Sequence, residues 1–382
     1  MKTLALYGGE PVRREPYKIL PQFDETEYAG VEKILRSGDI SDFGGQYAVK
    51  EFESSFAKYL GVDFAVALNS GTAALHTAFV ASGMKPGDEA IVPPFTFIST
   101  VSPLLQIGVR PVFSDIDRDS YCLDPAKIEE KITPRTKAVI PVQLYGNIAD
   151  MKDIVDVSKR NGLSLIEDAA QAHGADMDGR FAGTFGDVGA FSFAQNKNMT
   201  TGEGGMLVTN DSKIYTIAKL LRQNGKSNWR THDILGYNYR MTEMQAAIGV
   251  EQVKKLPEMN RKRREIANIY YKNLRGTDFT LPSVRKGVNH VYFKFPILVP
   301  ERFKDRRDLV VKAIKAENVP VEVGYPYPLY EINFLSEFRT ECPVAEDVCS
   351  RVINLFTGPS MQSDVGLQTA EAVKKVYNYL LV

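Results

Sequence analysis

A single lysine follows an expected strand and precedes a cluster of glycines, and its amine is the first group in the chain that suggests chemistry. The segment Gly186-Asp-Val-Gly-Ala-Phe-Ser-Phe-Ala-Gln-Asn-Lys197 ends on this lysine, and glycines follow at positions 202, 204 and 205. Because glycine permits positive φ and close backbone approach, Lys197 can be aimed at a ligand that lies against the main chain. The same pattern also fits a surface lysine in a glycine-rich hairpin. Spacing alone leaves both interpretations open.

Two further segments place polar groups at the ends of expected strands. Asp168 ends the apolar run that begins at Ser164, and open α/β sheets bind ligands at the carboxyl ends of their strands. In Asn69-Ser-Gly-Thr-Ala-Ala-Leu75 a strand gives way to the start of a helix, where free N–H groups and hydroxyls bind phosphate well. An Asp, Ser or Thr at such a place is also a common helix cap.

These strand ends would bring a phosphate site, a carboxylate and an amine to one ligand. Pyridoxal phosphate needs these three groups, because an amine forms a Schiff base with it, an acid keeps its pyridine nitrogen protonated and an anion site holds its phosphate. Along the chain the phosphate loop comes first, then Asp168 and then Lys197. This set of groups therefore predicts a site for pyridoxal phosphate.

In these and neighbouring motifs the chain resembles the sugar aminotransferases of the DegT/DnrJ/StrS type, which have the aspartate aminotransferase fold (fold type I). The resemblance is specific from about Leu20 to Gly249 and looser from there to the C-terminus. It rests on Asn69-Ser-Gly-Thr-Ala-Ala-Leu75, Pro94-Phe-Thr-Phe-Ile-Ser-Thr100, Glu167-Asp-Ala-Ala-Gln171, Ser192-Phe-Ala-Gln-Asn-Lys197, Gly202-Glu-Gly-Gly205 and Gly236-Tyr-Asn-Tyr-Arg-Met-Thr-Glu243.

The resemblance implies roles for the matching positions. Lys197 would form the Schiff base, and Asp168 would hold the proton on the pyridinium nitrogen. The partners would be a keto-sugar, an amino-acid donor and a second copy of the chain, in a homodimer with composite active sites. The other cofactor contacts would come from Gly71, Thr72, Ala73 and Ser192 near the phosphate, Phe97 on the ring face, Gln171 at the ring hydroxyl and Asn238 from the neighbouring subunit.

The implied activity is a transamination in amino-sugar biosynthesis, from glutamate or glutamine to a keto-sugar that in this family is often nucleotide-linked. The opening Leu6-Tyr-Gly-Gly-Glu-Pro-Val-Arg13 and the segment Thr200-Thr-Gly-Glu-Gly-Gly205 resemble the branch with aminohydroxybenzoate synthases and aminocyclitol aminotransferases. A cyclitol ketone or aminoshikimate-type acceptor is therefore the alternative. Some relatives are sugar dehydratases and carry His at the position of Lys197, so this lysine disfavours a dehydratase. A regulator without turnover is disfavoured because no DNA-binding helix pair is attached.

The elements that must position these residues alternate between strands and helices from residue 60 onward, as in βαβ units. Two shorter strands, Asp187–Phe193 and Gly205–Asn210, would extend the same sheet as a hairpin. The fold class is therefore α/β, and the resemblance implies a large, mostly parallel seven-stranded sheet with helices on both faces and a smaller α+β C-terminal domain. The other expected strands are Phe64–Leu68, Glu89–Pro93, Arg110–Ile116, Lys137–Val142 and Ser164–Asp168, with helices beginning near Gly71, Ile98, Asp124 and Asp150.

A change in composition suggests the domain boundary. Long helices are expected from Thr242 to about Arg275, and a second strand-and-helix region follows from His290. Between Leu256 and Arg264 lysine and arginine dominate, which is typical of a solvated helix face. We therefore expect a large cofactor-binding domain over residues 1–255, with an N-terminal arm over about 1–25, and a small domain over 256–382.

Composition argues against several classes of protein. The chain has 382 residues with 47 Lys plus Arg and 47 Asp plus Glu, so it lacks the excess of cations that nucleic-acid binding requires. It has three cysteines, an odd number without CxxC spacing, which fits a reducing cytoplasm better than a disulfide framework. No apolar run reaches the roughly 18 residues that spanning a bilayer needs, so neither a membrane nor a nucleic acid is an expected partner.

Several other residues have two open interpretations. Trp229 and Arg230 could contact a substrate or the dimer partner. His173 follows the Asp168 motif and would either line the site or pack in the core. The segment from Tyr325 to Tyr330 resembles the family's Tyr-Pro-x-Pro-Leu near the substrate mouth, and a packed aromatic turn fits it equally. No metal site is expected, because the four histidines lie far apart in the sequence: His76, His173, His232 and His290.

Overall fold

One large sheet holds the strands that carry the expected site. The computed structural model describes residues 3–18, 20–41, 47–228 and 230–380. Its seven-stranded sheet has the order β1-β9-β8-β5-β4-β2-β3, and only β9 runs antiparallel to its neighbours. The predicted mostly parallel sheet is therefore confirmed. The strands are β1 Phe64–Leu68, β2 Glu89–Val92, β3 Arg110–Phe113, β4 Thr136–Val139, β5 Ser164–Asp168, β8 Val188–Ser192 and β9 Gly205–Thr209.

Helices cover both faces of this sheet, as predicted. Successive side chains of a strand point to opposite faces, so neighbouring residues of β8 contact different helices. On one face the Phe191 ring lies 5.0 Å from the Phe56 ring of α2 (Tyr47–Leu60). On the other face Ser192 packs against Gly71 at the start of α3 (Gly71–Ala81). Each expected strand forms, although β3 and β4 end three residues before the predicted position, and β8 pairs with β9 as predicted.

The helix expected near Asp124 does not form. Its place is taken by two short 3-10 turns, η3 (Pro125–Lys127) and η4 (Glu129–Lys131). Asp124 still acts as a cap and accepts a hydrogen bond from the Ala126 N–H at 2.9 Å. The chain has little room for more, because Pro134 restricts the residue before it to extended backbone. Near Ile98 another 3-10 turn, η2 (Ile98–Thr100), precedes α4 (Ser102–Gln106). The helix expected near Asp150 is α5 (Met151–Arg160).

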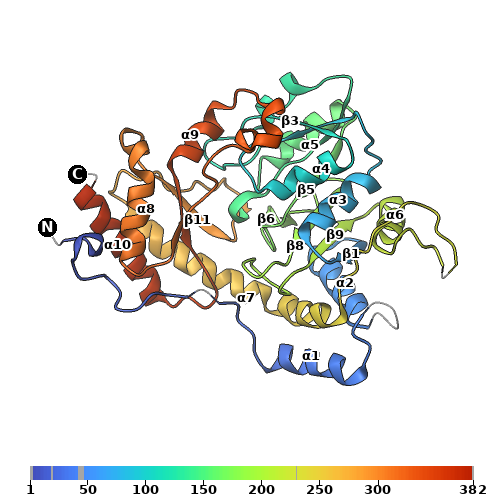
Figure 1. Cartoon of the computed structure of the whole chain (residues 1–382), viewed down its shortest axis with the longest axis horizontal. Helices are drawn as coiled ribbons and strands as arrows, with labels where there is room; N and C mark the ends of the chain where they lie inside the picture. The colour runs from blue at the N-terminus through green and yellow to red at the C-terminus, as the bar shows by residue number, and fades with distance from the viewer. Residues whose placement is uncertain (1–2, 19, 42–46, 229, 381–382) are drawn as a thin grey trace.

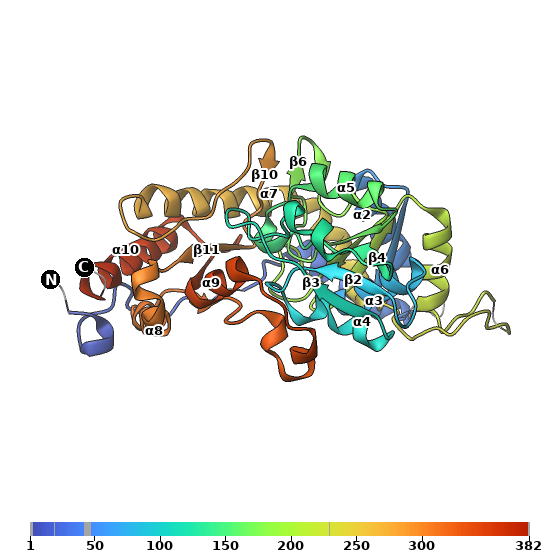
Figure 2. The same ribbon diagram turned by 90° about the horizontal axis from the view of Figure 1, so that it is seen from above.

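A single helix of 32 residues, α7 (Glu243–Leu274), runs along the molecule from the large sheet to the smaller one (Figures 1 and 2). Its buried residues up to Met259 join the core of the large sheet, and those from Ile266 join a second core. This change supports a division near residue 256, which we retain as a proposal. Leu4 belongs to the second core, so the N-terminal arm packs on the small domain.

The small domain is built on a three-stranded antiparallel sheet in the order β11-β13-β12. Helices pack around it (Figure 1), and the N-terminal arm contacts α10, where the rings of Tyr7 and Tyr379 lie 5.9 Å apart. No described helix is long and apolar enough to cross a membrane. The elements are β11 Lys294–Leu298, β12 Val321–Val323, β13 Val352–Phe356, α8 Arg307–Ala316, α9 Pro343–Arg351 and α10 Ser363–Leu380, while α1 Glu25–Ser37 and α6 Ser212–Arg222 flank the large domain.

Candidate active site

A cavity of about 480 Å³ opens between the two domains. It lies where β5 and β8 end and α3 begins, the sheet edge at which open α/β folds bind ligands. The small domain closes its other side with residues of β11, β12 and β13. Most of the predicted cofactor residues line this one cavity: Gly71, Thr72, Phe97, Asp168, Gln171, Ser192 and Lys197.

Asp168 is a buried carboxyl, 5% exposed. Its Oδ2 accepts a hydrogen bond from the Thr100 hydroxyl at 2.7 Å, and its Oδ1 accepts one from the Ala170 N–H at 3.1 Å. Burial raises the pKa of Asp168 above its ordinary value, and the Thr100 bond and the charge of Lys197 counter only part of that effect. No ion pair involves Asp168 in the described part of the chain. The cavity therefore holds a carboxyl that a cationic ligand would stabilise.

Lys197 lies in the loop between β8 and β9, where its side chain is partly buried. Its Nζ lies 4.8 Å from the centre of the Phe293 ring. Burial lowers the pKa of Lys197 to about 8, against the opposing influence of Asp168 and Glu203. An amine with this pKa is partly neutral near pH 7, so it can act as a nucleophile and as a base.

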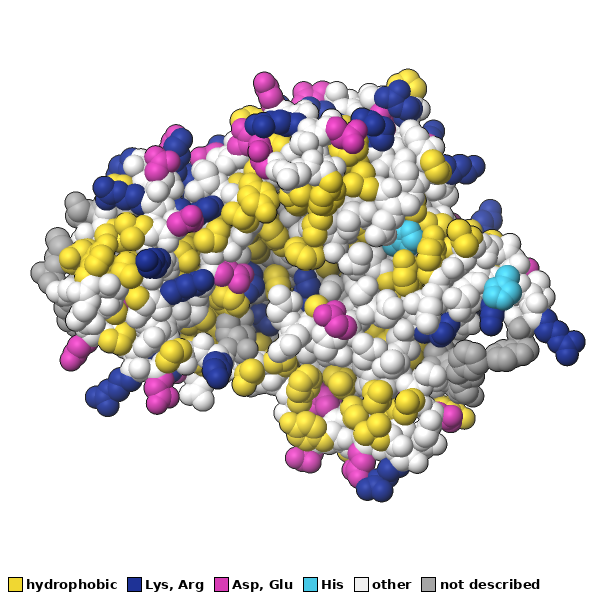
Figure 3. Space-filling view, viewed as in Figure 1, with side chains coloured by type: hydrophobic (Ala, Val, Ile, Leu, Met, Phe, Trp, Pro, Cys, Tyr) yellow, Lys and Arg dark blue, Asp and Glu magenta, His cyan; other side chains and the backbone are white. Residues whose placement is uncertain are grey.

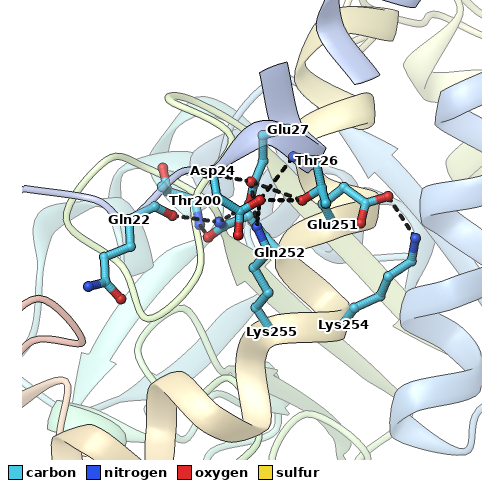
Figure 4. Close-up of polar contacts among 9 residues, drawn as sticks. All are labelled: Gln22, Asp24, Thr26, Glu27, Thr200, Glu251, Gln252, Lys254 and Lys255. Atoms are coloured by element: carbon cyan, nitrogen blue, oxygen red, sulfur yellow. Dashed lines mark hydrogen bonds and ion pairs between the residues drawn. The ribbon is translucent and has the colours of Figure 1, made fainter. Parts of the chain in front are cut away.

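A polar network connects the loop of Lys197 to two helices (Figure 4). The Thr200 N–H donates to Gln252 Oε1 of α7 at 3.4 Å. Gln252 Nε2 donates in turn to Glu27 Oε1 of α1 at 2.7 Å and to the Gln22 carbonyl at 3.1 Å. Lys255, one turn further along α7, pairs with Glu27 at 2.5 Å. Through Gln252, the N-terminal segment is therefore hydrogen-bonded to the loop that carries Lys197.

The start of α3 forms the opposite wall of the cavity. The Ser70 hydroxyl caps this helix and accepts a hydrogen bond from the Ala73 N–H at 3.1 Å, so Ala73 already has a partner and does not line the cavity. Gly71 approaches β8 so closely that a Cβ there would lie 2.6 Å from the Ser192 Cβ. The first N–H groups of a helix lack partners within it. Gly71 and Thr72 therefore form a narrow cradle suited to an anion.

Aromatic and amide side chains line the cavity between these two walls. Phe97 lies on its wall with 56% of its surface exposed, as an apolar ring does when its partner is a ligand. Gln171 Oε1 accepts from the Tyr145 N–H at 2.9 Å, and its Nε2 donates to the Tyr325 hydroxyl at 2.8 Å. Tyr325 also packs edge-on against Phe95 with ring centres 5.4 Å apart. Both interpretations of this tyrosine therefore apply, since it lines the cavity and packs in an aromatic turn.

The other candidates lie away from the cavity. Asn238 is exposed on the segment before α7, where its carbonyl accepts from Asn69 Nδ2 at 3.3 Å. His173 is fully buried near the rings of Phe191 and Phe193, and burial lowers its pKa to about 3, so it is a neutral core residue. Arg230 is exposed, and Trp229 lies outside the described residues. Within the described ranges no cluster of three potential metal ligands occurs.

Three residues that matter to the site were not singled out from the sequence, one beneath the cavity and two on its wall. Thr100, the partner of Asp168, belongs to a quoted motif, but nothing local indicates its contact with a residue 68 positions away. Lys294 and Glu322 come from two strands of the small sheet and form an ion pair at 3.2 Å. A lysine inside the apolar run Val291-Tyr-Phe-Lys-Phe-Pro-Ile-Leu298 is the one signal in the sequence that could have identified that pair.

Comparison with known proteins places this arrangement in a family. The model of the DegT/DnrJ/EryC1/StrS aminotransferase family matches residues 21–374. The chain belongs to this family. It is 39% identical to a GDP-perosamine synthase of Escherichia coli O157:H7, over 93% of this chain and 96% of the relative. It is 40% identical to a UDP-N-acetyl-3-dehydro-alpha-D-glucosamine 3-aminotransferase of Acidithiobacillus ferrooxidans, over 91% of this chain and 92% of the relative.

Solved structures share the fold of this chain. The crystal structure of DesV from S. venezuelae, in complex with a ketimine intermediate, has a TM-score of 0.88 and 33% identity, over 94% of this chain and 98% of that chain. The structure of NtdA from Bacillus subtilis with bound cofactor PMP has a TM-score of 0.86 and 28% identity, over 96% of this chain and 86% of that chain. The predicted family, fold and aminotransferase activity are thereby confirmed.

Proposed function

We propose that this aminotransferase uses pyridoxal phosphate to move the amino group of glutamate or glutamine to a nucleotide-linked keto-sugar. The observation that carries the proposal is the meeting of Lys197, Asp168 and the start of α3 on the walls of one cavity. The relatives support the substrate class, since the names of both contain a sugar linked to a nucleoside diphosphate.

The residues of the cavity fit this cofactor. The N-terminus of α3 at Gly71 and Thr72, which the absence of a side chain at Gly71 allows to pack directly against Ser192 of β8, suits a phosphate. The buried carboxyl of Asp168 has no ion-pair partner among the described residues, and a protonated ring nitrogen would supply one. The lowered pKa of Lys197 suits an amine that attacks an aldehyde. Phe97, Gln171 and Ser192 lie on the same walls, where we propose that they contact the ring, its hydroxyl and the phosphate.

The side chains of the cavity would then divide the work of the reaction. When bound, pyridoxal phosphate supplies an aldehyde that takes up the amino group and a ring that accepts the electrons of a broken C–H bond. Asp168 would keep the ring nitrogen protonated. Lys197 Nζ, once released, would take the proton from the α-carbon of the donor, and in the second half-reaction it would deliver a proton to the acceptor carbon that gains the amine.

A homodimer with shared sites is part of the proposal. Tyr28 and Leu35 on α1 are 58% and 57% exposed, and Figure 3 shows hydrophobic side chains gathered over that helix. Monomeric soluble proteins rarely expose large continuous apolar patches, so a second copy of the chain is expected to cover this one. Asn238, exposed and outside its own cavity, would then reach the phosphate held by the partner subunit.

A test in two steps separates the acceptor classes. The holoenzyme is first converted to its amine form with glutamate or glutamine, and it is then mixed with nucleotide-linked keto-sugars or with cyclitol ketones. We expect a keto-sugar to restore the absorption of the aldehyde form. Restoration by cyclitol ketones alone would show that the proposed acceptor class is wrong, and failure of both amino acids in the first step would refute transamination with these donors.

A further inference from the structure

A second buried lysine faces the same cavity from the small domain. Lys294 begins β11, where it pairs in register with Phe356 of β13. Two residues back along β13, Asn354 pairs with Glu322 of β12. Because every second residue of a strand shares a face, these four side chains lie on one face of the small sheet, and all but Phe356 line the cavity. The opposite face carries Phe295 and Leu355 into the core.

The charge of Lys294 is only partly compensated. Its side chain is 7% exposed, and its Nζ lies 3.2 Å from Glu322 Oε1 and 3.1 Å from the centre of the Phe356 ring. Glu322 is the only carboxylate paired with this ammonium among the described residues, and it is itself 40% exposed. Burial lowers the pKa of Lys294 to about 8. An ammonium has three N–H donors, so Lys294 retains capacity for another anion.

Lys294 and Lys197 share one part of the cavity. Both ammonium groups lie near the Phe293 ring, with Nζ at 5.5 Å and 4.8 Å from its centre. The backbone also fixes this region, because the Phe293 N–H donates to the carbonyl of Tyr145 in the large domain at 2.8 Å. A substrate carbon whose proton Lys197 transfers would therefore lie in the part of the cavity that Lys294 also lines, and so would an anion bonded directly to that carbon.

We propose that Lys294 binds the α-carboxylate of the amino-acid donor, and that Glu322 takes the place of this carboxylate when the neutral part of the acceptor occupies the site. The inference rests on the proposed function. The α-carboxylate is one bond from the reacting carbon, whereas the diphosphate of a nucleotide sugar is separated from the keto carbon by the sugar ring. Glu322 would also repel a diphosphate more strongly than a single carboxylate. Its partial exposure lets it turn toward water as the donor enters.

Binding of an unreactive donor tests the inference without turnover. We would titrate α-methylglutamate, which has the α-carboxylate but no α-proton, into holoenzyme in a calorimeter. Lys294→Met should raise its Kd about ten- to a hundredfold, the range of a charge-assisted hydrogen bond, while Lys294→Arg should retain most of the affinity. Glu322→Gln should lower the Kd, because it removes the competing carboxylate. Binding of 4-aminobutyrate, which lacks an α-carboxylate, should not change in any variant.

The results that would contradict the inference can be told apart from those that would contradict the proposed function. Unchanged binding of α-methylglutamate by Lys294→Met, or weaker binding by Glu322→Gln, would overturn the inference. A loss of affinity confined to the nucleotide sugar would assign Lys294 to phosphate instead. If Lys294→Met does not fold, the affinity retained in Lys294→Arg and the affinity gained in Glu322→Gln still test the pair. Failure of the wild-type enzyme to react with any amino acid would refute the proposed function itself.

Discussion

Partial removal from water gives the two central side chains their chemistry. Burial raises the pKa of Asp168 and lowers that of Lys197 to about 8, so each group is biased toward its neutral form in the absence of a ligand. A positive ring nitrogen on the cofactor would stabilise the ionised carboxylate of Asp168, and the aldehyde of the cofactor would react with the neutral amine of Lys197. This reciprocity distinguishes the pair from a helix cap and a surface lysine.

Replacing Asp168 separates catalysis from capping. Asp168→Asn keeps an oxygen for the Ala170 N–H but loses the charge that holds the ring proton. A charge pair about 4 Å apart is worth roughly 4 kcal/mol at an effective dielectric of 20, so kcat should fall about a thousandfold, with little change in Tm. Asp124→Asn, at a cap outside the cavity, is the matched control and should retain activity. Near-normal activity with a lowered Tm in Asp168→Asn would favour the capping role.

The pKa of Lys197 predicts a pH profile for cofactor attachment. Only the neutral amine attacks an aldehyde, so the rate at which cofactor-free enzyme takes up pyridoxal phosphate should rise with pH. Its midpoint should lie near pH 8 instead of the ordinary 10.5. Stopped-flow absorbance measures the rate, and the profile should persist in Lys294→Met, where loss of a neighbouring positive charge can only raise the midpoint. A midpoint near 10.5, or a profile lost on removal of Lys294, would contradict the assignment.

At the scale of elements, the contact of α1 with α7 predicts a pH-dependent stability. Burial alone would raise the pKa of Glu27, but hydrogen bonds from Lys255 and Gln252 outweigh it and hold the pKa below 4.5. The stabilisation is therefore complete above pH 4.5 and is lost as pH falls through the lowered value. Glu27→Gln should reduce the free energy of unfolding by about 1–3 kcal/mol at pH 7, and this difference should shrink toward pH 3.

Urea unfolding at several pH values measures that difference. Glu258→Gln is the matched control, because Glu258 forms an exposed ion pair with Arg261 on the same helix, and exposed pairs contribute little. We expect no measurable change in that variant. A Glu27→Gln difference that stays constant with pH would show that packing, not charge, maintains the contact of α1 with α7.

The elements of the large sheet were predictable because local apolar runs coincide with buried strands. β1 and β5 have the predicted bounds, while β3 and β4 end three residues early. The reason is that residues such as Ile116 and Val142 are buried but form only isolated bridges, to Leu123 and Asp168, and apolarity reports burial, not continuous pairing. The helix expected near Asp124 does not form. Asp124 is a cap, but the segment between it and Pro134 is too short for a helix to continue.

Some residues of the candidate site could likewise be predicted from local sequence, and others depend on long-range contacts. Lys197, Asp168 and the start of α3 come from motifs that lie at strand ends, so the sequence could identify them. Lys294 and Glu322 meet only because β13 lies between their strands. No local pattern specifies that order, which results from the packing of the small sheet against α8 and α10.

At the scale of the molecule, a shared site predicts complementation between inactive chains. We expect neither Lys197→Ala nor Asn238→Asp homodimers to have a native site, the second because a carboxylate repels the cofactor phosphate. A heterodimer would contain one native site. Random exchange gives roughly half heterodimers, so about a quarter of all sites should regain activity in a two-fold dimer. Activity equal to the average of the separate variants, with exchange confirmed by differential tags, would show that Asn238 serves its own subunit.

The most direct test of the central claim is to trap the cofactor on its lysine. Holoenzyme is reduced with borohydride, digested and mapped by mass spectrometry, with and without prior incubation with glutamate. The assignment predicts cofactor mass on the peptide that contains Lys197, and loss of that label after glutamate has converted the cofactor to its free amine form. A label on Lys294, or a label on Lys197 that neither glutamate nor glutamine removes, would contradict the claim that Lys197 is the cofactor lysine of a working aminotransferase.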